Sequence, residues 1–173
     1  WTLSRGLGDV YKRQCVLNPG KGPDGQERDG MSIVWHGINR GRVTLAAQAS
    51  GTISLLLEQA VLYSGKRCTW GQPIQTRELV LGRLGRMAAA QLVCEALSGW
   101  SASLIDDGRS GELEAILAKV VASRCLRQAA IDALGIHGGR AFLVGHPLGD
   151  SFHDHFAAGV YEGESDLLGL ALL

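Results

Sequence analysis

From residue 39 onward, hydrophobic residues recur at steps of three and four, which is the spacing of one face of an α-helix. This pattern predicts helices over residues 40–64, 76–104, 112–136 and 151–160, and a last helix that starts near Ser165. Leu81, Met87 and Leu92 are expected on the buried face of the second helix. Because long helices joined by short turns pack against their neighbours in opposite directions, we predict an all-α fold. It is an antiparallel up-down four-helix bundle with an additional short C-terminal helix, preceded by an irregular N-terminal segment.

The first predicted helix carries a stripe of small residues. Ala47, Ser50, Gly51 and Ser54 fall on the same face as its hydrophobic positions. Small side chains let the backbones of two helices come close together. We therefore expect a neighbouring helix to approach the first helix closely along this stripe.

The N-terminal part of the chain lacks the helical pattern. Residues 1–14 resemble a peptide produced when sequencing-adapter DNA is translated, so we exclude them from the fold prediction and expect the chain to be a fragment. Residues 15–30 are rich in Gly, Pro, Asp and Lys and predict a loop or hairpin. Residues 31–36 alternate loosely and predict either a short strand or the start of a helix. The predicted domains are thus 1–14, a linker at 15–38, and the bundle at 39–173.

Composition and charge exclude several classes of protein. Hydrophobic residues make up 46% of the chain and charged residues 20%, which is typical of a globular domain. The 17 basic and 17 acidic residues cancel, so there is no electrostatic case for binding nucleic acid or an anionic membrane. The longest uncharged run, 43–57, is too short and too polar to predict a membrane span. The cysteines are far apart and indicate reduced thiols rather than disulfides or a zinc site: Cys15, Cys68, Cys94 and Cys125.

The most distinctive stretch lies near the end of the chain. In Tyr161-Glu162-Gly163 a carboxylate stands between an aromatic residue and a glycine, just before a final apolar segment. The simplest interpretation is a surface glutamate at a turn. Motifs upstream favour a second interpretation.

These motifs, taken together, resemble the C-terminal helical domain of acyl-CoA dehydrogenases. Tyr161-Glu162-Gly163 resembles the family's Tyr-Glu-Gly-Thr signature, and residues 66–74 resemble its Arg-x-x-Phe-Gly-x-x-Ile motif, with Trp70 in place of Phe. Three more motifs follow in the family's order: Ala118-Lys119, Ile136-His137-Gly138-Gly139 and His153-Asp154. The resemblance covers residues 39–173. It implies that residues 15–38 are a linker or the end of a preceding β-domain.

The resemblance implies a reaction and a base. Members of this family remove an α-proton and a β-hydride from an acyl-CoA thioester, and FAD accepts the hydride. A carboxylate can remove such a proton only if it is placed against the hydrogen in apolar surroundings. The matching residue is Glu162, the expected catalytic base. Some members carry the base on the first helix instead, and the equivalent residue is Gly41, which has no side chain to act.

The resemblance also implies binding residues. Those expected to bind the cofactor are Arg67, Thr69, Trp70, Gly138, Gly139 and Glu164. Those expected to bind the substrate are Arg42, Asn39, Tyr161 and Gly163. Four of these residues have structural alternatives. Arg67 can complement a helix dipole, Arg42 can be a surface residue at a helix start, and the glycine pair can simply end a helix.

Besides Trp70, the chain departs from the family pattern at four positions. Gly135 replaces a glutamine, Glu164 a threonine, His153 an arginine, and Asn39 a common acidic residue. Because Glu162 is retained, we expect altered flavin contacts rather than loss of activity in the parent enzyme.

The expected partners are an acyl-CoA substrate, an electron-transfer flavoprotein as electron acceptor, and further copies of the chain in a homodimer or homotetramer. We expect a cytoplasmic protein of bacterial origin. Two alternatives remain. One is a helical domain that serves only oligomerisation, and the other is a metal-binding bundle that uses the histidines and carboxylates of the C-terminal third. The second lacks the Glu-x-x-His spacing of ferritin-like sites, so no metal ligand is predicted.

Overall fold

The computed structural model describes residue 21 and residues 30–172. Its contacts divide the chain into two units, residues 1–38 and residues 39–173. The foreign-looking residues 1–14 and almost all of the predicted loop or hairpin at 15–30 lie outside the described residues. The predicted domain boundaries stay predictions.

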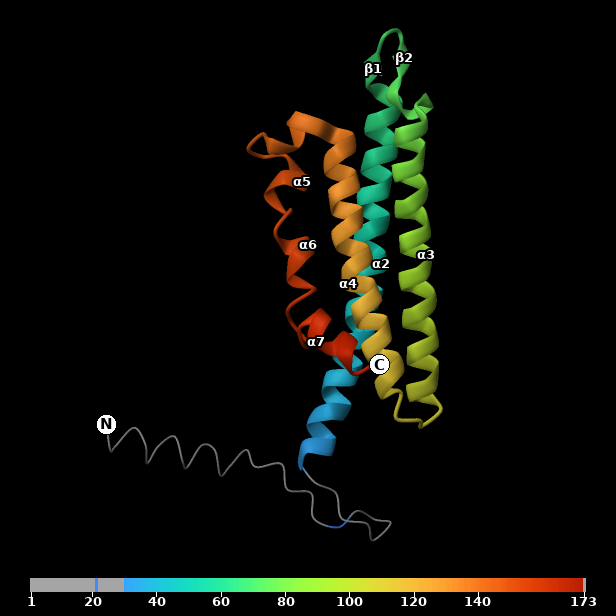
Figure 1. Cartoon of the computed structure of the whole chain (residues 1–173), viewed down its shortest axis with the longest axis vertical. Coiled ribbons are helices and arrows are strands. Elements are labelled where there is room, and N and C mark those ends of the chain that lie inside the picture. The colour runs from blue at the N-terminus through green and yellow to red at the C-terminus, as the bar shows by residue number, and fades with distance from the viewer. Residues whose placement is uncertain (1–20, 22–29, 173) are drawn as a thin grey trace, which may run out of the picture. The chain divides into compact units, whose positions relative to one another are not determined.

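Three long helices form the bundle: α2 (Gly30–Lys66), α3 (Glu78–Asp106) and α4 (Glu112–His137). Successive helices run in opposite directions (Figure 1). The all-α prediction is confirmed. Residues 31–36 begin α2, so the start-of-helix alternative is right and the short strand is wrong.

The core lies where the three helices meet. Ile53 of α2, Met87 and Cys94 of α3, and Ala122 of α4 are almost fully buried in one hydrophobic cluster. Two serine hydroxyls join α2 to α3, because Ser50 donates to the carbonyl of Gln91 and Ser98 to that of Val43, each over 3.3 Å. The close approach predicted for the small-residue stripe is confirmed at Ser50. Its other members, Ala47, Gly51 and Ser54, line an open groove beside α3.

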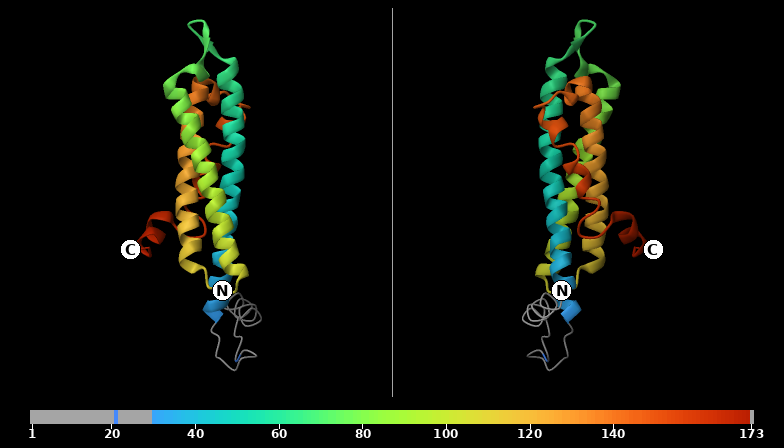
Figure 2. Two further views of the ribbon diagram at one scale, coloured as in Figure 1. Left: turned by 90° about the vertical axis from the view of Figure 1, so that its right-hand side faces the viewer. Right: turned by 90° about the vertical axis from the view of Figure 1, so that its left-hand side faces the viewer.

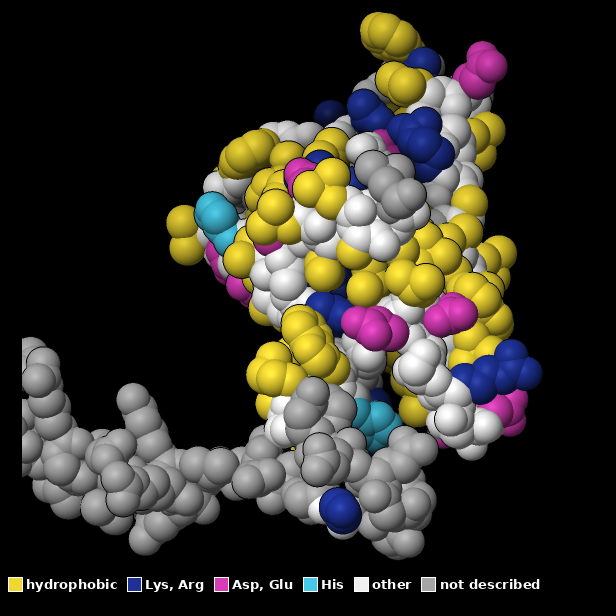
Figure 3. Space-filling model, turned by 60° about the horizontal axis from the view of Figure 1, so that its bottom comes forward, with side chains coloured by type: hydrophobic (Ala, Val, Ile, Leu, Met, Phe, Trp, Pro, Cys, Tyr) yellow, Lys and Arg dark blue, Asp and Glu magenta, His cyan; other side chains and the backbone are white. Residues whose placement is uncertain are grey.

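Only a narrow line of α3 faces the core. Its buried residues recur every seven positions: Val80, Met87, Cys94 and Ser101. The prediction that Leu81 and Leu92 are buried is wrong, since they are 54% and 62% exposed. The physical reason is that α3 lies at the edge of the bundle. It contacts the other helices along a single line of residues, so its other faces stay exposed. Hydrophobic side chains are prominent on the face of the molecule that Figure 3 shows.

A short hairpin connects α2 to α3. Its strands, β1 (Cys68–Thr69) and β2 (Gln72–Pro73), pair antiparallel with Thr69 opposite Gln72. Trp70 and Gly71 form the turn with φ of 50° and 75°, as two-residue hairpin turns require. A 3-10 turn, η1 (Ile74–Thr76), leads into α3.

The fourth side of the bundle is a chain of short helices rather than one helix. It comprises η2 (Gly138–Phe142), α5 (Pro147–Asp150) and α6 (Asp154–Ala157), and α7 (Ser165–Leu170) follows. The predicted continuous helix over 151–160 is therefore wrong. Gly149 packs so tightly on Ala141 that a Cβ there would overlap the Ala141 carbonyl, and hydrogen bonds of the tighter 3-10 type replace helical ones between the segments. This irregular stretch descends beside α4, and α7 then turns outward (Figure 2).

One helical stretch, Ile33–Lys66, is long and apolar enough to cross a membrane by length and composition alone. Its most apolar window is 39% buried within the fold, and core helices of globular proteins pass the same test, so this is weak evidence for a span.

Candidate active site

Glu162 lies in the turn between α6 and α7, close to the N-terminal half of α2. Its backbone adopts a left-handed conformation, with φ of 59°, which residues other than glycine rarely occupy. The Nε of Arg42 donates to the main-chain oxygen of Glu162 over 3.1 Å. This bond ties the turn to α2 across 120 positions of sequence.

The carboxylate of Glu162 rests on the bare surface of α2 at Gly41. A Cβ placed on Gly41 would lie 2.7 Å from Oε1, 2.8 Å from Cδ and 3.0 Å from Oε2 of Glu162. Such distances are shorter than van der Waals contact, so any side chain at position 41 would push the carboxylate away. Gly41 therefore provides the space in which the expected base lies.

Asn39 and Arg42 lie beside this carboxylate in a buried polar pair. Nη1 of Arg42 donates to Oδ1 of Asn39 over 2.9 Å, and both residues are buried. Burial lowers the pKa of the Arg42 guanidinium, while the nearby carboxylates of Glu112 and Glu162 act in the opposite direction. The structural alternative of an exposed surface arginine is wrong for Arg42, because its side chain is held inside the site.

Tyr161 and Gly163 flank Glu162. Tyr161 is half-exposed. Gly163 has φ of 103°, and a Cβ there would lie 3.0–3.3 Å from the side chain of Leu168. Only glycine fits this position without strain, whatever else it contacts.

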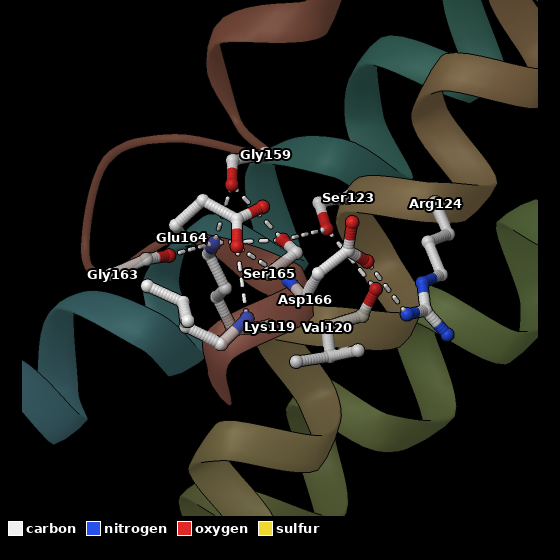
Figure 4. A network of polar contacts seen from close by, with 10 residues as sticks. Lys119, Val120, Ser123, Arg124, Gly159, Gly163, Glu164, Ser165 and Asp166 are labelled. Atoms are coloured by element: carbon white, nitrogen blue, oxygen red, sulfur yellow. Dashed lines mark hydrogen bonds and ion pairs between the residues drawn. The ribbon is translucent and has the colours of Figure 1, made fainter. Parts of the chain in front are cut away.

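Lys119 of α4 lies beneath the turn and is fully buried. Its Nζ donates to the carbonyl oxygens of Gly159 and Gly163 and to Oγ of Ser165 (Figure 4). Sequence reasoning noted Ala118-Lys119 only as a matching motif and assigned it no role. A lysine among hydrophobic positions on a helix was the available signal, because buried lysines need several acceptors.

Glu164, expected near the flavin, caps α7 in this structure. Its Oε2 accepts hydrogen bonds from the backbone amides of Asp166 and Leu167 over 2.9 and 2.8 Å. These bonds lower the pKa of the Glu164 carboxyl. Its flavin contact stays a prediction.

A second cluster forms at the other end of α2. Arg67 lines an open pocket of about 590 Å³ together with Tyr63, Lys66 and Arg140. Three cationic side chains around one pocket suit an anionic group such as a phosphate. Arg140, from the turn after α4, was not among the predicted residues.

Thr69 and Trp70 belong to the hairpin above this pocket. Nη2 of Arg77 donates to the carbonyl oxygen and to Oγ1 of Thr69, over 2.9 and 2.8 Å. The Arg77 guanidinium carbon lies 4.9 Å from the centre of the Trp70 ring. Trp70 is nevertheless 92% exposed, so most of its ring is available for contact.

Gly138 ends α4 and Gly139 follows it into η2. Gly138 has φ of 61° and its amide donates to the carbonyl of Leu134, which confirms that the pair ends a helix. A Cβ on either glycine would meet no atom within 4 Å, so the backbone here is open to a ligand. The preceding His137 is buried and stacks on Tyr63, with ring centroids 4.6 Å apart.

The remaining departures from the family pattern have defined positions. Where the family has glutamine, the space over Gly135 is filled by Arg83 of α3, whose Nη1 would lie 2.8 Å from a Cβ there. His153 is exposed at the start of α6. Among the described residues, no group of three His, Cys, Asp or Glu could hold a metal ion.

The two clusters lie far apart in one copy of the chain. From Arg42 to Lys66, α2 rises about 36 Å, at about 1.5 Å per residue. The structure brings Asn39, Arg42, Tyr161, Glu162, Gly163 and Glu164 together at one level of α2. It brings Arg67, Thr69 and Trp70 together near its C-terminal end, with Gly138 and Gly139 directly before the pocket residue Arg140.

Comparisons with known proteins show the family of the chain. The family model for the acyl-CoA dehydrogenase C-terminal domain matches residues 28–172. A Bacillus subtilis (strain 168) protein named acyl-CoA dehydrogenase is 32% identical over 148 residues, which cover 86% of this chain and 39% of that protein. Among solved structures, the prolyl acyl carrier protein oxidase AnaB superposes with a TM-score of 0.80 at 28% identity and covers 86% of this chain and 39% of its own.

Butyryl-CoA dehydrogenase from Megasphaera elsdenii superposes with a TM-score of 0.79 at 26% identity, over 86% of this chain and 39% of that chain. This chain thus spans about two fifths of the length of these relatives. The helical bundle, the order of its motifs and the matched family model agree, and the chain belongs to the acyl-CoA dehydrogenase family, in which it corresponds to the C-terminal domain.

Proposed function

We propose that this chain is the C-terminal domain of an FAD-dependent acyl-CoA dehydrogenase and that Glu162 is its catalytic base. The observation that carries the proposal is the Glu162 carboxylate resting on α2 at Gly41, while Arg42 holds the backbone behind it. A base on a fixed backbone has fewer positions open to its oxygens, which favours removal of a weakly acidic proton.

The reaction removes two hydrogens from neighbouring carbons of the acyl chain. One oxygen of Glu162 takes the α-hydrogen as a proton, and the electrons of that C–H bond form the new α,β double bond. The β-hydrogen leaves with its electron pair as a hydride. Bound FAD supplies the two-electron acceptor that no amino-acid side chain provides. Glu162 would hold the α-proton and the thioester would gain a double bond. The bound cofactor would take up the β-hydrogen with its electron pair, so atoms and electrons balance.

The pocket at the C-terminal end of α2 fits part of this cofactor. Lys66, Arg67 and Arg140 surround it, and a guanidinium fork suits the paired oxygens of a pyrophosphate. The open backbone at Gly138 and Gly139 offers amide donors nearby. Thr69 and Trp70 of the hairpin complete the proposed cofactor-binding group.

A cofactor shared between copies explains why the two clusters are far apart. A separation of about 36 Å along α2 favours a site in which one copy supplies Glu162 and another supplies Arg67. We therefore propose a homodimer or homotetramer in the cytoplasm. Exposed leucines such as Leu55, Leu81 and Leu92 suit burial in such an assembly. An electron-transfer flavoprotein would reoxidise the flavin.

The proposed substrate is an acyl-CoA thioester that lies against Asn39, Arg42, Tyr161 and Gly163. The relatives include a dehydrogenase, an oxidase of a carrier-protein substrate, and a protein named acryloyl-CoA reductase (NADH) from Anaerotignum propionicum. Each name refers to a thioester or carrier-bound acyl group, which is the shared chemistry that supports this substrate class.

The test uses the protein encoded by the full reading frame that contains this chain. Its visible spectrum is recorded before and after addition of acyl-CoA thioesters of graded length, with Glu162→Gln in parallel. We expect a yellow protein that bleaches with at least one thioester, and a variant that binds flavin but stays yellow. A protein that stays colourless with added flavin would overturn the proposal and favour a domain that serves only oligomerisation.

A further inference from the structure

Lys119 is a buried charge that the proposed reaction does not use. Its side chain is 0% exposed, on the face of α4 that packs toward the turn carrying Glu162. Moving an ammonium group out of water is costly unless several acceptors surround it. Lys119 therefore indicates a site built around its charge.

The acceptors of Lys119 lie on both sides of Glu162. Nζ donates to the carbonyl of Gly159 over 3.2 Å, to the carbonyl of Gly163, and to Oγ of Ser165 over 2.9 Å. The backbone amide of Ser165 also donates to the Gly159 carbonyl over 2.9 Å. Residues 159–165 thus form a closed loop with one ammonium group at its centre, as Figure 4 shows.

Two further contacts anchor this loop to the helices. Oγ of Ser123, one turn after Lys119 on α4, lies 2.8 Å from Oγ of Ser165. On the opposite side, Arg42 of α2 holds the oxygen of Glu162. The loop is therefore held at its ends by α4 and at its middle by α2.

We propose that Lys119 is the positioning residue of the catalytic base: it holds residues 159–165 in the one conformation that directs the Glu162 carboxylate over Gly41. This inference rests on the proposed function, since it assumes that Glu162 is the base. The left-handed φ of 59° at Glu162 supports it, because a residue with a side chain keeps that conformation only where its surroundings impose it.

The charges around Lys119 agree with this role. Burial lowers the pKa of its ammonium group, and Arg42 acts in the same direction, whereas Glu164 and Glu162 oppose the shift. The two carboxylates thus favour the charged form of Lys119, in which all three hydrogens are available to the three acceptors.

The first experiment measures the loop itself by amide hydrogen exchange, in the protein from the full reading frame. Lys119→Met keeps an unbranched side chain one heavy atom shorter and removes every donor. We expect residues 159–165, including the Ser165 amide, to exchange at least ~10-fold faster, because local opening is no longer opposed by these bonds. Lys119→Arg should restore part of the protection, since a guanidinium can still donate to several of the oxygens.

Asp132→Asn is the matched control, because Asp132 is also a buried charge on α4 but pairs with Arg86, remote from the loop. It should lower the melting temperature without changing exchange at 159–165. If Lys119→Met does not fold, Ser165→Ala tests the same proposal. Because it removes one acceptor of Lys119, it should speed amide hydrogen exchange in residues 159–165. Unchanged exchange in the folded variant would overturn the proposal.

The second experiment follows flavin reduction by acyl-CoA. Lys119→Met should lower the rate by up to about 100-fold, as misplacement of a reacting group by about 1 Å does. The dissociation constant of the thioester should change little, because Lys119 contacts the loop rather than the substrate. A wild type that is not bleached contradicts the proposed function. In that case the hydrogen-exchange experiment still tests whether Lys119 holds residues 159–165 in place. A wild type and a Lys119→Met variant that bleach equally fast contradict the role of Lys119 alone.

Discussion

Gly41 shows how a missing side chain can shape a site. The Glu162 carboxylate lies where a Cβ of residue 41 would be, at 2.7–3.0 Å from three of its atoms. We expect Gly41→Ala to displace the carboxylate and to slow flavin reduction by about 10- to 100-fold in the full-length protein. Stopped-flow bleaching with a thioester measures this effect.

Gly51→Ala is the control for this prediction. Gly51 lies on the same helix, and a Cβ there would meet nothing within 4 Å. Both substitutions should favour helix formation by roughly 1 kcal/mol, since alanine is the better helix former. Only Gly41→Ala should affect the rate, and equal rates in the two variants would contradict the placement of Glu162.

We expect His137 to make the stability of the bundle depend on pH. Burial lowers the pKa of its imidazole, and the nearby His146 lowers it further. The hydrogen bond between Nδ1 and the Ala133 carbonyl acts in the opposite direction. Below about pH 6.5 the unfolded chain takes up a proton that the folded chain resists. The contribution of neutral His137 to the free energy of unfolding is therefore fully present above that pH. It is lost as the pH falls below it.

The variant His137→Phe isolates this effect. Phenylalanine keeps an aromatic ring against Tyr63 but cannot take up a proton. We expect denaturant unfolding between pH 7.5 and 5 to show a smaller loss of stability in the variant than in wild type. The loss that remains includes His155, whose pKa burial also lowers. Identical pH dependence in the two proteins would show that His137 is not the source of the loss of stability.

At the residue scale, most residues of the candidate site could be predicted from the sequence, but the lysine that holds the turn around Glu162 could not. The motif around Glu162 and the position of Arg42 were enough to predict that these residues belong to one site. Lys119 was not assigned a role, because its acceptors lie about 40 residues further along and in a turn of irregular shape. No periodic pattern in a sequence reports such a contact.

At the scale of elements, α2 carries both the core and the site. Ile53 is 0% exposed within the core, whereas Leu55, two positions on, is 61% exposed. We expect Ile53→Ala to lower the free energy of unfolding by about 2–5 kcal/mol, since it leaves a cavity. Leu55→Ala should change it by less than about 0.5 kcal/mol in the isolated chain. Equal losses, measured by urea unfolding, would show that the helix is rotated from the orientation described.

The short helix α7 depends on its cap. Glu164 accepts two amide hydrogen bonds at its start. Glu164→Ala should therefore speed hydrogen exchange at Asp166 and Leu167, whereas Glu164→Thr, the residue typical of the family, should protect them because threonine also caps helices. Equal exchange in the two variants would contradict the capping role.

The main part of each long helix was predictable, whereas the start of α2 and the short helices were not. Helix α2 begins at Gly30, ten residues before its predicted start. Helices α3 and α4 follow the predicted ranges within a few residues, because their hydrophobic periodicity extends over many turns. Between Gly138 and Gly163 the chain changes direction at glycines and 3-10 turns, and a few hydrophobic residues at helical spacing were misread as one helix. Packing of Gly149 against Ala141 decides that path, and the sequence does not show it.

At the scale of the whole molecule, the proposed base and the proposed phosphate pocket lie at different levels of α2. This separation suits an active site completed by a second copy, whose Arg67 would serve the flavin beside the first copy's Glu162. Exposed hydrophobic residues on α2 and α3 provide surface for such an assembly. The proposed role of Glu162, removal of the α-proton, is nevertheless local to one copy of the chain.

The most direct test is exchange of the α-hydrogen with solvent. The full-length protein is incubated with an acyl-CoA thioester in deuterium oxide without an electron acceptor, and the recovered thioester is analysed by mass spectrometry. We expect deuterium at the α-carbon with wild type, because the proton held by Glu162 exchanges with solvent before it returns. Glu162→Gln should bind the thioester and incorporate none. Deuterium incorporation at the wild-type rate in this variant would show that another group is the base.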